Sequence, residues 1–146
     1  MASFKFASLV TESIPVSAAL GVDANNKLDS NDNGKAVKLG TAQNYVLCAT
    51  GDDIEGTLIG VEAHTVNDGF SFGSVKEDGI VEVEVAAAEV GTIAVGDFVV
   101  SGIPVARNTA GNLMVIAGAG ADYKWRVIQH ITGTGVSGDK MLIKRV

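Results

Sequence analysis

Ser71 lies in the segment that most resembles a catalytic motif. The segment Gly69–Gly73 matches the G-x-S-x-G pattern of esterase nucleophiles. Asp97 or Asp122, followed by His130, completes the chain order of a catalytic triad. That mechanism needs a strand, a sharp turn and a helix, which together hold the serine hydroxyl clear of the backbone. Here phenylalanines alternate with the serine and a second turn signal follows. We therefore expect Ser71 on the polar face of a strand, without a catalytic role.

The loop Asp29–Gly34 reads D-S-N-D-N-G and matches the first half of an EF-hand calcium loop. Calcium takes oxygen ligands, and the glycine allows the sharp turn between them. The glutamate that closes such a loop is replaced by Gly40, and no helical pattern follows. We expect a surface loop of Asx turns, and calcium binding by Asp29–Gly34 stays open as the alternative.

The glycines of Gly133–Gly138 match G-x-G-x-x-G, the pattern of dinucleotide-binding loops. Dinucleotide binding requires a helix to begin at these glycines, whereas only a short strand-like segment follows. We expect a hairpin turn. Lys140 resembles the lysine of lipoyl and biotinyl carrier domains, which stands on an exposed turn. The strands that would follow such a lysine are missing, so a carrier domain is the less favoured reading.

The chain has two histidines, His64 and His130, and one cysteine, Cys48. They lack the local spacing of metal ligands, and we expect no metal, no cofactor and no enzymatic activity. His130 should be a solvated strand residue beside Lys124 and Arg126. Cys48 lies in an apolar run and should behave as a small buried hydrophobe.

Composition excludes several classes of protein. With one cysteine among 146 residues the chain forms no internal disulfide, and no apolar run is long enough to span a bilayer. The net charge of −6 disfavours binding to nucleic acid or to an anionic membrane. Residues 1–97 hold 15 acids and 5 bases, whereas residues 98–146 hold 2 acids and 6 bases. Either strands of the two parts pair and neutralise each other, or complementary faces meet between subunits.

Short runs of β-forming residues separated by glycine turns predict an all-β fold. The nine predicted strands are 36–39, 45–49, 57–63, 70–75, 80–85, 97–101, 113–117, 123–131 and 140–146. Asp68-Gly69 and Asp78-Gly79 are the strongest hairpin signals. Within 80–85 the valines should face inward and the glutamates outward. Within 123–127 Trp125 and Val127 should face inward, and bases there would pair with the glutamates if the two strands are neighbours. The predicted fold is a small antiparallel β-barrel or sandwich.

Residues 1–34 differ from this body. They read as an extended N-terminal arm and a polar loop, and residues 35–146 read as the barrel or sandwich domain. The arm's apolar residues should be buried against coat protein or a neighbouring subunit; these contact candidates are Phe4, Phe6, Leu9, Val10, Ile14 and Val16. Because no predicted strand lies there, we expect deletion of residues 2–20 to leave the body folded and to weaken binding.

The stretch from about Thr57 to Val146 resembles the head decoration, or capsid cement, proteins of tailed phages. The resemblance lies in the order and spacing of six short segments, which are Gly56–Glu62, Asp78–Val83, Thr92–Val99, Gly111–Leu113, Lys124–Ile128 and Met141–Val146. It implies a non-enzymatic virion protein, often a homotrimer, that is made in the host cytoplasm. It also implies binding to the major capsid (coat) protein on the outer capsid surface, where coat subunits meet. A β-rich tail or fibre component of the virion is the alternative.

Overall fold

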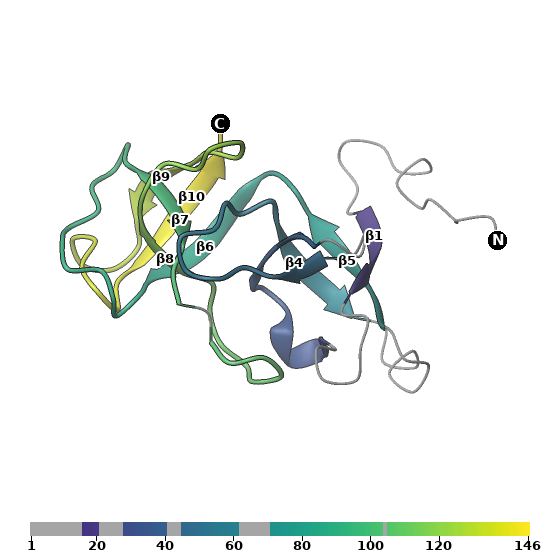
Figure 1. Cartoon of the computed structure of the whole chain (residues 1–146). Helices are drawn as coiled ribbons and strands as arrows, with labels where there is room; N and C mark the ends of the chain where they lie inside the picture. The colour runs from purple at the N-terminus through teal and green to yellow at the C-terminus, as the bar shows by residue number, and fades with distance from the viewer. Residues whose placement is uncertain (1–15, 21–27, 41–44, 62–70, 104) are drawn as a thin grey trace.

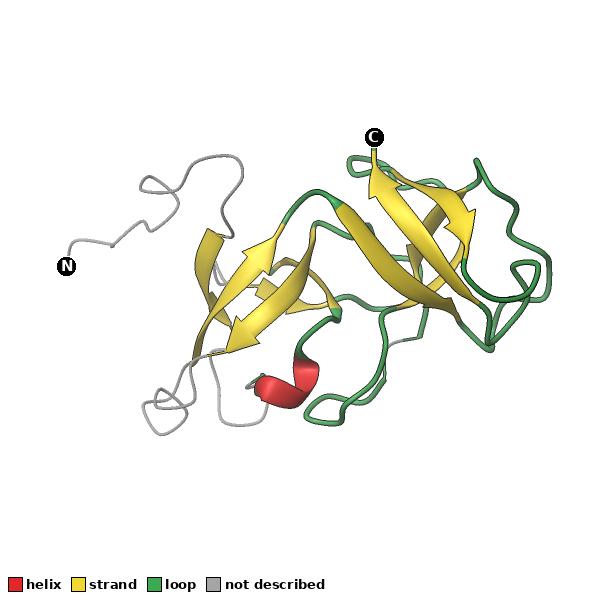
Figure 2. Ribbon diagram, turned by 180° about the vertical axis from the view of Figure 1, so that it is seen from behind, coloured by secondary structure: helices red, strands yellow, loops and turns green. Residues whose placement is uncertain are grey.

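The structure, a computed structural model, describes residues 16–20, 28–40, 45–61, 71–103 and 105–146. Over these residues it contains ten strands and one 3-10 turn, η2 (Ser30–Asp32), and no α-helix. The strands form two closed five-stranded sheets that lie side by side (Figures 1 and 2). The predicted all-β fold is confirmed, and the strands are divided between two barrels instead of one body.

The first barrel has the strand order β1-β3-β2-β4-β5. Its strands are β1 (Val16–Leu20), β2 (Ala36–Leu39), β3 (Tyr45–Leu47), β4 (Gly56–Val61) and β5 (Ser71–Lys76). Neighbours pair antiparallel, apart from a parallel contact of β1 with β3 that closes the barrel. Leu28, Val37, Tyr45, Leu58 and Val75 fill its interior.

The second barrel has the strand order β10-β6-β8-β7-β9. Its strands are β6 (Ile80–Val85), β7 (Phe98–Ser101), β8 (Met114–Ala117), β9 (Trp125–His130) and β10 (Lys140–Arg145). Val83 and Val85 point into the core, as do Trp125 and Val127, so the predicted inward faces of both strands are confirmed.

A shared seam joins the two barrels. Cys48 and Ile54 come from the first half of the chain but pack in the core of the second barrel. The indole Nε1 of Trp125 donates to the Ile54 carbonyl at 2.8 Å. The Asp53 carboxylate accepts the N–H groups of Ala121, Asp122 and Tyr123 at 2.8–3.3 Å. Partial burial works to raise the pKa of Asp53, but these three donors outweigh it and lower the pKa.

All nine predicted strands are present, and each end lies within two residues of its expected position. Asp68-Gly69 lies outside the described residues, and the strands on either side of it, β4 and β5, pair antiparallel. Asp78-Gly79 is not a hairpin. Gly79, at a φ of 90°, turns the chain from β5 into β6, which belongs to the other barrel. Turn chemistry marks a sharp reversal but leaves open whether the flanking strands pair.

The expectation that no strand lies within residues 2–20 is wrong. β1 pairs with β5 over five residues, from Val16 opposite Val75 to Leu20 opposite Ser71. Leu28 and Asp32 are buried as well. Two pieces of the segment expected to be an arm and loop are therefore part of the first barrel.

Candidate functional site

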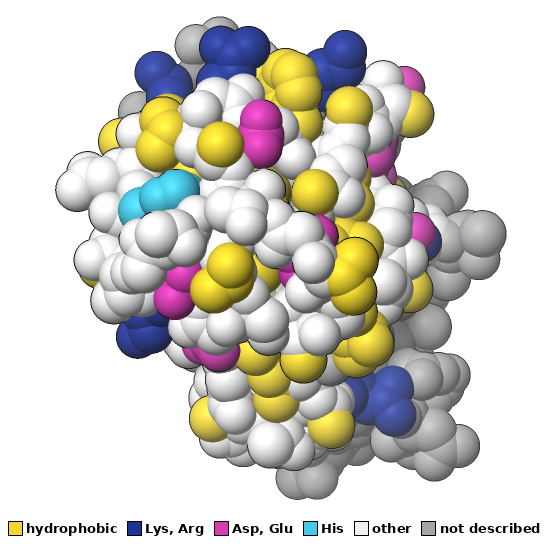
Figure 3. Space-filling model, turned by 90° about the vertical axis from the view of Figure 1, so that its left-hand side faces the viewer, with side chains coloured by type: hydrophobic (Ala, Val, Ile, Leu, Met, Phe, Trp, Pro, Cys, Tyr) yellow, Lys and Arg dark blue, Asp and Glu magenta, His cyan; other side chains and the backbone are white. Residues whose placement is uncertain are grey.

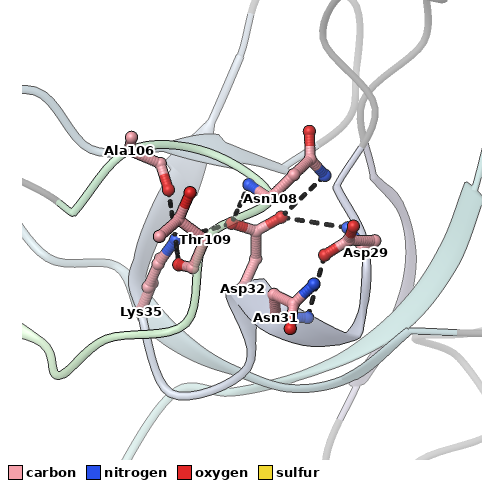
Figure 4. Close-up of polar contacts among 7 residues, drawn as sticks. All are labelled: Asp29, Asn31, Asp32, Lys35, Ala106, Asn108 and Thr109. Carbon is pink, nitrogen blue, oxygen red and sulfur yellow. Dashed lines mark hydrogen bonds and ion pairs between the residues drawn. The ribbon is translucent and has the colours of Figure 1, made fainter.

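The loop Asp29–Gly34 forms a capped 3-10 turn. The Asp29 side chain accepts the N–H of Asn31 at 2.8 Å, and the Asp32 side chain accepts the N–H of Asp29 at 3.0 Å (Figure 4). Reciprocal bonds of this kind satisfy backbone donors that a short helix leaves unpaired. The expected Asx-type loop is confirmed, although one of its carboxylates, that of Asp32, is fully buried.

Asp32 forms a buried ion pair with Lys35, whose Nζ lies 2.7 Å from Asp32 Oδ1. Lys35 Nζ also donates to the carbonyls of Ala106 at 2.9 Å and Thr109 at 2.7 Å (Figure 4). Asp32 accepts the backbone N–H of Asn108 at 2.9 Å and its side-chain amide at 3.3 Å. The pair therefore ties the β7–β8 connection of the second barrel to the turn that lies between β1 and β2 of the first barrel.

Every hydrogen-bonding position of this pair is occupied by protein. An ammonium group has three donors, and Lys35 uses all three on Asp32, Ala106 and Thr109. Asp32 accepts four bonds, two on each oxygen. Within the described residues no group of three or more acidic, histidine or cysteine side chains could hold a metal ion. The geometry gives Asp32 a structural role in joining the barrels.

The residues of the esterase-like triad lie in different barrels. Ser71 is the first residue of β5 and pairs with Leu20, so it lies in a strand as expected. His130 ends β9, and its Nε2 lies 2.8 Å from the Ile93 carbonyl. It was expected to be solvated beside Lys124 and Arg126, but this contact holds it against the neighbouring loop. Asp97 accepts the N–H of Ala94 at 2.9 Å.

The glycine-rich segment 133–138 is the turn between β9 and β10, as predicted. The Asp139 carboxylate accepts the N–H groups of Thr134, Gly135 and Val136, and these donors lower its pKa. Lys140 lies beyond this turn, in β10 opposite Glu84, and its Nζ is 3.6 Å from Glu82. A carrier lysine stands on the turn itself, so Lys140 does not occupy that position.

Cys48 is buried, as expected. Burial, together with the neighbouring Asp52 carboxylate, raises the pKa of its thiol to about 12. Its Sγ lies 3.5 Å from the Asp53 carbonyl. His64 lies outside the described residues.

Most candidate contact residues of the N-terminal segment also lie outside the described residues; these are Phe4, Phe6, Leu9, Val10 and Ile14. Val16 is the exception, because it begins β1 and its backbone pairs with Val75. The described structure therefore fixes where this segment joins the body: it enters the first barrel through β1, beside β5.

A row of residues crosses the outer face of the second barrel. Lys144 lies opposite Ile80 on one side and Arg126 on the other, and Arg126 lies opposite Phe98. Directly opposed residues share one face of a sheet, so four neighbouring strands contribute to this row. Lys124 joins it, with its Nζ 6.0 Å from the centre of the Phe98 ring. We call Lys124, Arg126 and Lys144 the basic row.

The basic row is exposed and unneutralised. All three side chains are exposed, and within the described part of the chain none forms an ion pair. Figure 3 shows Lys and Arg side chains along its upper edge, with hydrophobic atoms between them. The guanidinium of Arg126 lies 5.1 Å from the Phe98 ring centre, a contact worth about 0.5–1 kcal/mol at exposed sites.

The expected pairing of these bases with the glutamates of β6 does not occur. β10 lies between β6 and β9, so Glu82 lies near Lys140 instead. The sequence indicated that Lys124 and Arg126 face outward but not which strand adjoins them. Lys144 lies opposite Arg126 because of the register between β10 and β9, which the sequence does not predict.

Two adjacent loops at the end of the second barrel carry exposed aliphatic side chains. The loop before β7 and the β9–β10 turn are joined by the Ile93 N–H, which donates to the Gly135 carbonyl at 2.9 Å. Figure 3 views this end and shows hydrophobic side chains over its surface. We call this group the apolar tip; it consists of Val90, Val95, Ile131 and Val136.

Comparison of the chain with family models, with curated proteins and with solved structures finds no match. Among the described residues no helix is long and apolar enough to cross a membrane. We therefore infer the function from the surface and contacts of the chain itself.

Proposed function

We propose that the protein is a non-enzymatic structural component of a tailed-phage virion. In this role it binds the major capsid protein on the outer surface of the head and stabilises the coat lattice, as a decoration or cement protein. It acts as a homotrimer. The resemblance in the order and spacing of short β segments between Thr57 and Val146 supports this class of protein.

The apolar tip is the observation that carries this proposal. Val90 is fully exposed, and Val95, Ile131 and Val136 are each more than 40% exposed. These exposed aliphatic side chains lie on two loops that are hydrogen-bonded to each other, and apolar side chains gathered at one end of a folded protein favour contact with another macromolecule. An aliphatic side chain that moves from water into an interface contributes about 1.5–3 kcal/mol, so the tip favours lasting attachment to a protein surface.

The two-barrel body suits a mechanical role. A cement must transmit force between coat subunits, and strands paired into two barrels form a body suited to that role. The Asp32–Lys35 pair and the Asp53 contacts hold the two barrels together. Specific interfaces typically bury about 1,200–2,000 Å², so the tip would form one part of a larger contact with coat protein.

Quantitative mass spectrometry of purified virions tests the proposal. Particles of the phage whose genome encodes the chain should retain it through density-gradient purification, in a fixed ratio to coat protein. Separated heads and tails should then be compared. Recovery with tails would favour the tail or fibre alternative, and absence from purified particles would contradict a virion role.

A further inference from the structure

We propose that the basic row binds a carboxylate-rich surface of a protein partner. This goes beyond the proposed function, since it needs only an acidic protein segment, whether or not that segment belongs to a coat protein. The site consists of Lys124, Arg126 and Lys144, flanked by Phe98 and the exposed Ile80. A partner segment with acidic and aliphatic side chains is complementary to it.

First, the basic row lowers the stability of the isolated protein. Arg126 and Lys144 lie directly opposite each other on adjacent strands, an arrangement that is destabilising for like charges. At the other end of β10 the charge of Lys140 is balanced by the Glu82 carboxylate, which lies 3.6 Å from its Nζ. Carboxylates of a binding partner would reduce the repulsion between Arg126 and Lys144.

Second, within the described residues Lys124, Arg126 and Lys144 form no ion pair. By contrast, Arg145, the neighbour of Lys144 in the chain, donates to the Glu77 carbonyl at 2.6 Å and covers the Tyr123 ring. Lys124 and Arg126 instead approach the ring of Phe98. An Arg or Lys held over an aromatic ring is partly ordered before binding, so less entropy is lost when a carboxylate arrives.

Third, the charge of the chain favours a short acidic protein segment over a nucleic acid as the anionic partner. Residues 98–146 carry a net charge of +4 and the rest of the chain carries −10. A long polyanion such as duplex nucleic acid would extend beyond the row and meet a protein whose overall charge is −6, which repels it. A short acidic protein segment would not, and the aliphatic Ile80 adds an apolar contact that a phosphate backbone cannot use.

Titration of the isotope-labelled full chain with a short glutamate-rich peptide, followed by NMR, tests the inference. The peptide should shift amide signals of β9 and β10 around Arg126 and Lys144. Binding should weaken as salt rises, because exposed charges are screened over about 10 Å at 0.1 M salt. A duplex DNA of similar charge serves as the competing probe.

Two double variants separate position from net charge. Arg126→Gln with Lys144→Gln should weaken peptide binding at least about tenfold, which is about 1.4 kcal/mol. Lys38→Gln with Lys140→Gln removes the same charge from cations already paired with Asp52 and Glu82, and should leave binding within about twofold of wild type. Circular dichroism checks that both variants are folded.

Several results would overturn the inference. These are equal losses in the two variants, shifts confined to other strands, no peptide binding at low salt, or tighter binding of the DNA at the row. Failure of the proposed function is distinguishable, because it would appear as absence of the chain from purified virions while peptide binding persists.

Discussion

Lys35 and Asp32 form a fully buried ion pair at the place where the two barrels meet. Burying two charges costs free energy that their attraction only roughly offsets, so such a pair adds little net stability by itself. Its geometry is nevertheless specific, because Lys35 Nζ reaches carbonyls of Ala106 and Thr109. We interpret the pair as setting how the β7–β8 connection sits on the first barrel.

Removing one partner of this pair should be strongly destabilising. Lys35→Met leaves the Asp32 carboxylate buried without its cation, which typically costs about 3–5 kcal/mol. The matched control is Lys38→Met, since Lys38 forms an exposed pair with Asp52 at 2.6 Å, and such a pair contributes at most about 1 kcal/mol. Chemical denaturation measures both; similar losses in the two variants would contradict a special role for Lys35.

Stability should fall at alkaline pH because of two buried acids. Burial raises the pKa of the Cys48 thiol from 9.0 to about 12, and burial together with the hydrogen bond to Glu77 raises that of Tyr45. Below pH 9 the thiol is protonated in both states. Above it the unfolded chain loses the proton and the folded chain keeps it, so unfolding becomes easier by up to about 1.4 kcal/mol per pH unit.

Cys48→Ala should flatten this decline between pH 9 and pH 12, as measured by urea denaturation at several pH values. Native Cys48 should also react with a thiol reagent only after unfolding, because the thiolate is the reactive form. Rapid reaction of the native protein at neutral pH would show that the thiol is neither buried nor shifted.

At the scale of strands, alternation and glycine punctuation were sufficient to predict β2 to β10. Val81, Val83 and Val85 alternate with glutamates, which only a half-buried strand explains. β1 was missed because its sequence, V-S-A-A-L, is made mostly of small residues and lacks alternation. The segment forms a strand because it pairs with β5, which lies far from it in the sequence.

The candidate site was predicted less well than the strands. Closure of two barrels and the basic row both depend on register, and no local pattern states which strand adjoins β9. The sequence also did not predict that Lys35 is buried, because a lysine after a polar loop normally faces water. The composition of the loop Asp29–Gly34 indicated Asx turns in the sequence, but it did not indicate the cation that the loop buries.

Two deletions distinguish β1 from the residues that precede it. Removal of residues 2–14 should leave both barrels folded and weaken binding to undecorated capsids at least about tenfold. Removal of residues 2–20 also takes away β1, whose ladder with β5 involves five residue pairs. At about 0.5–1.5 kcal/mol net per hydrogen bond, the longer deletion should cost about 2–5 kcal/mol.

Thermal denaturation and capsid co-sedimentation measure these effects. Equal stability of the two deletion variants would show that β1 is dispensable. Unchanged capsid binding after the shorter deletion would show that Phe4, Phe6, Leu9, Val10 and Ile14 make no contact with coat protein.

At the scale of the molecule, the shared seam predicts one cooperative unfolding transition. Cys48 and Ile54 lie in the core of the second barrel, and Trp125 is bonded to Ile54. Trp125 is the only tryptophan, so its fluorescence reports the seam. Its change in denaturant should coincide with the loss of the β signal in circular dichroism; two separate transitions would show that the barrels unfold independently.

A cryo-electron microscopy map of the phage head would show whether the protein is a capsid decoration protein. We expect density for the two-barrel body on the outer surface of the capsid, in groups of three copies where coat subunits meet. The basic row should face acidic coat residues, and the apolar tip should be covered. A map with the chain in the tail, or a fully resolved head surface without it, would contradict the proposed role.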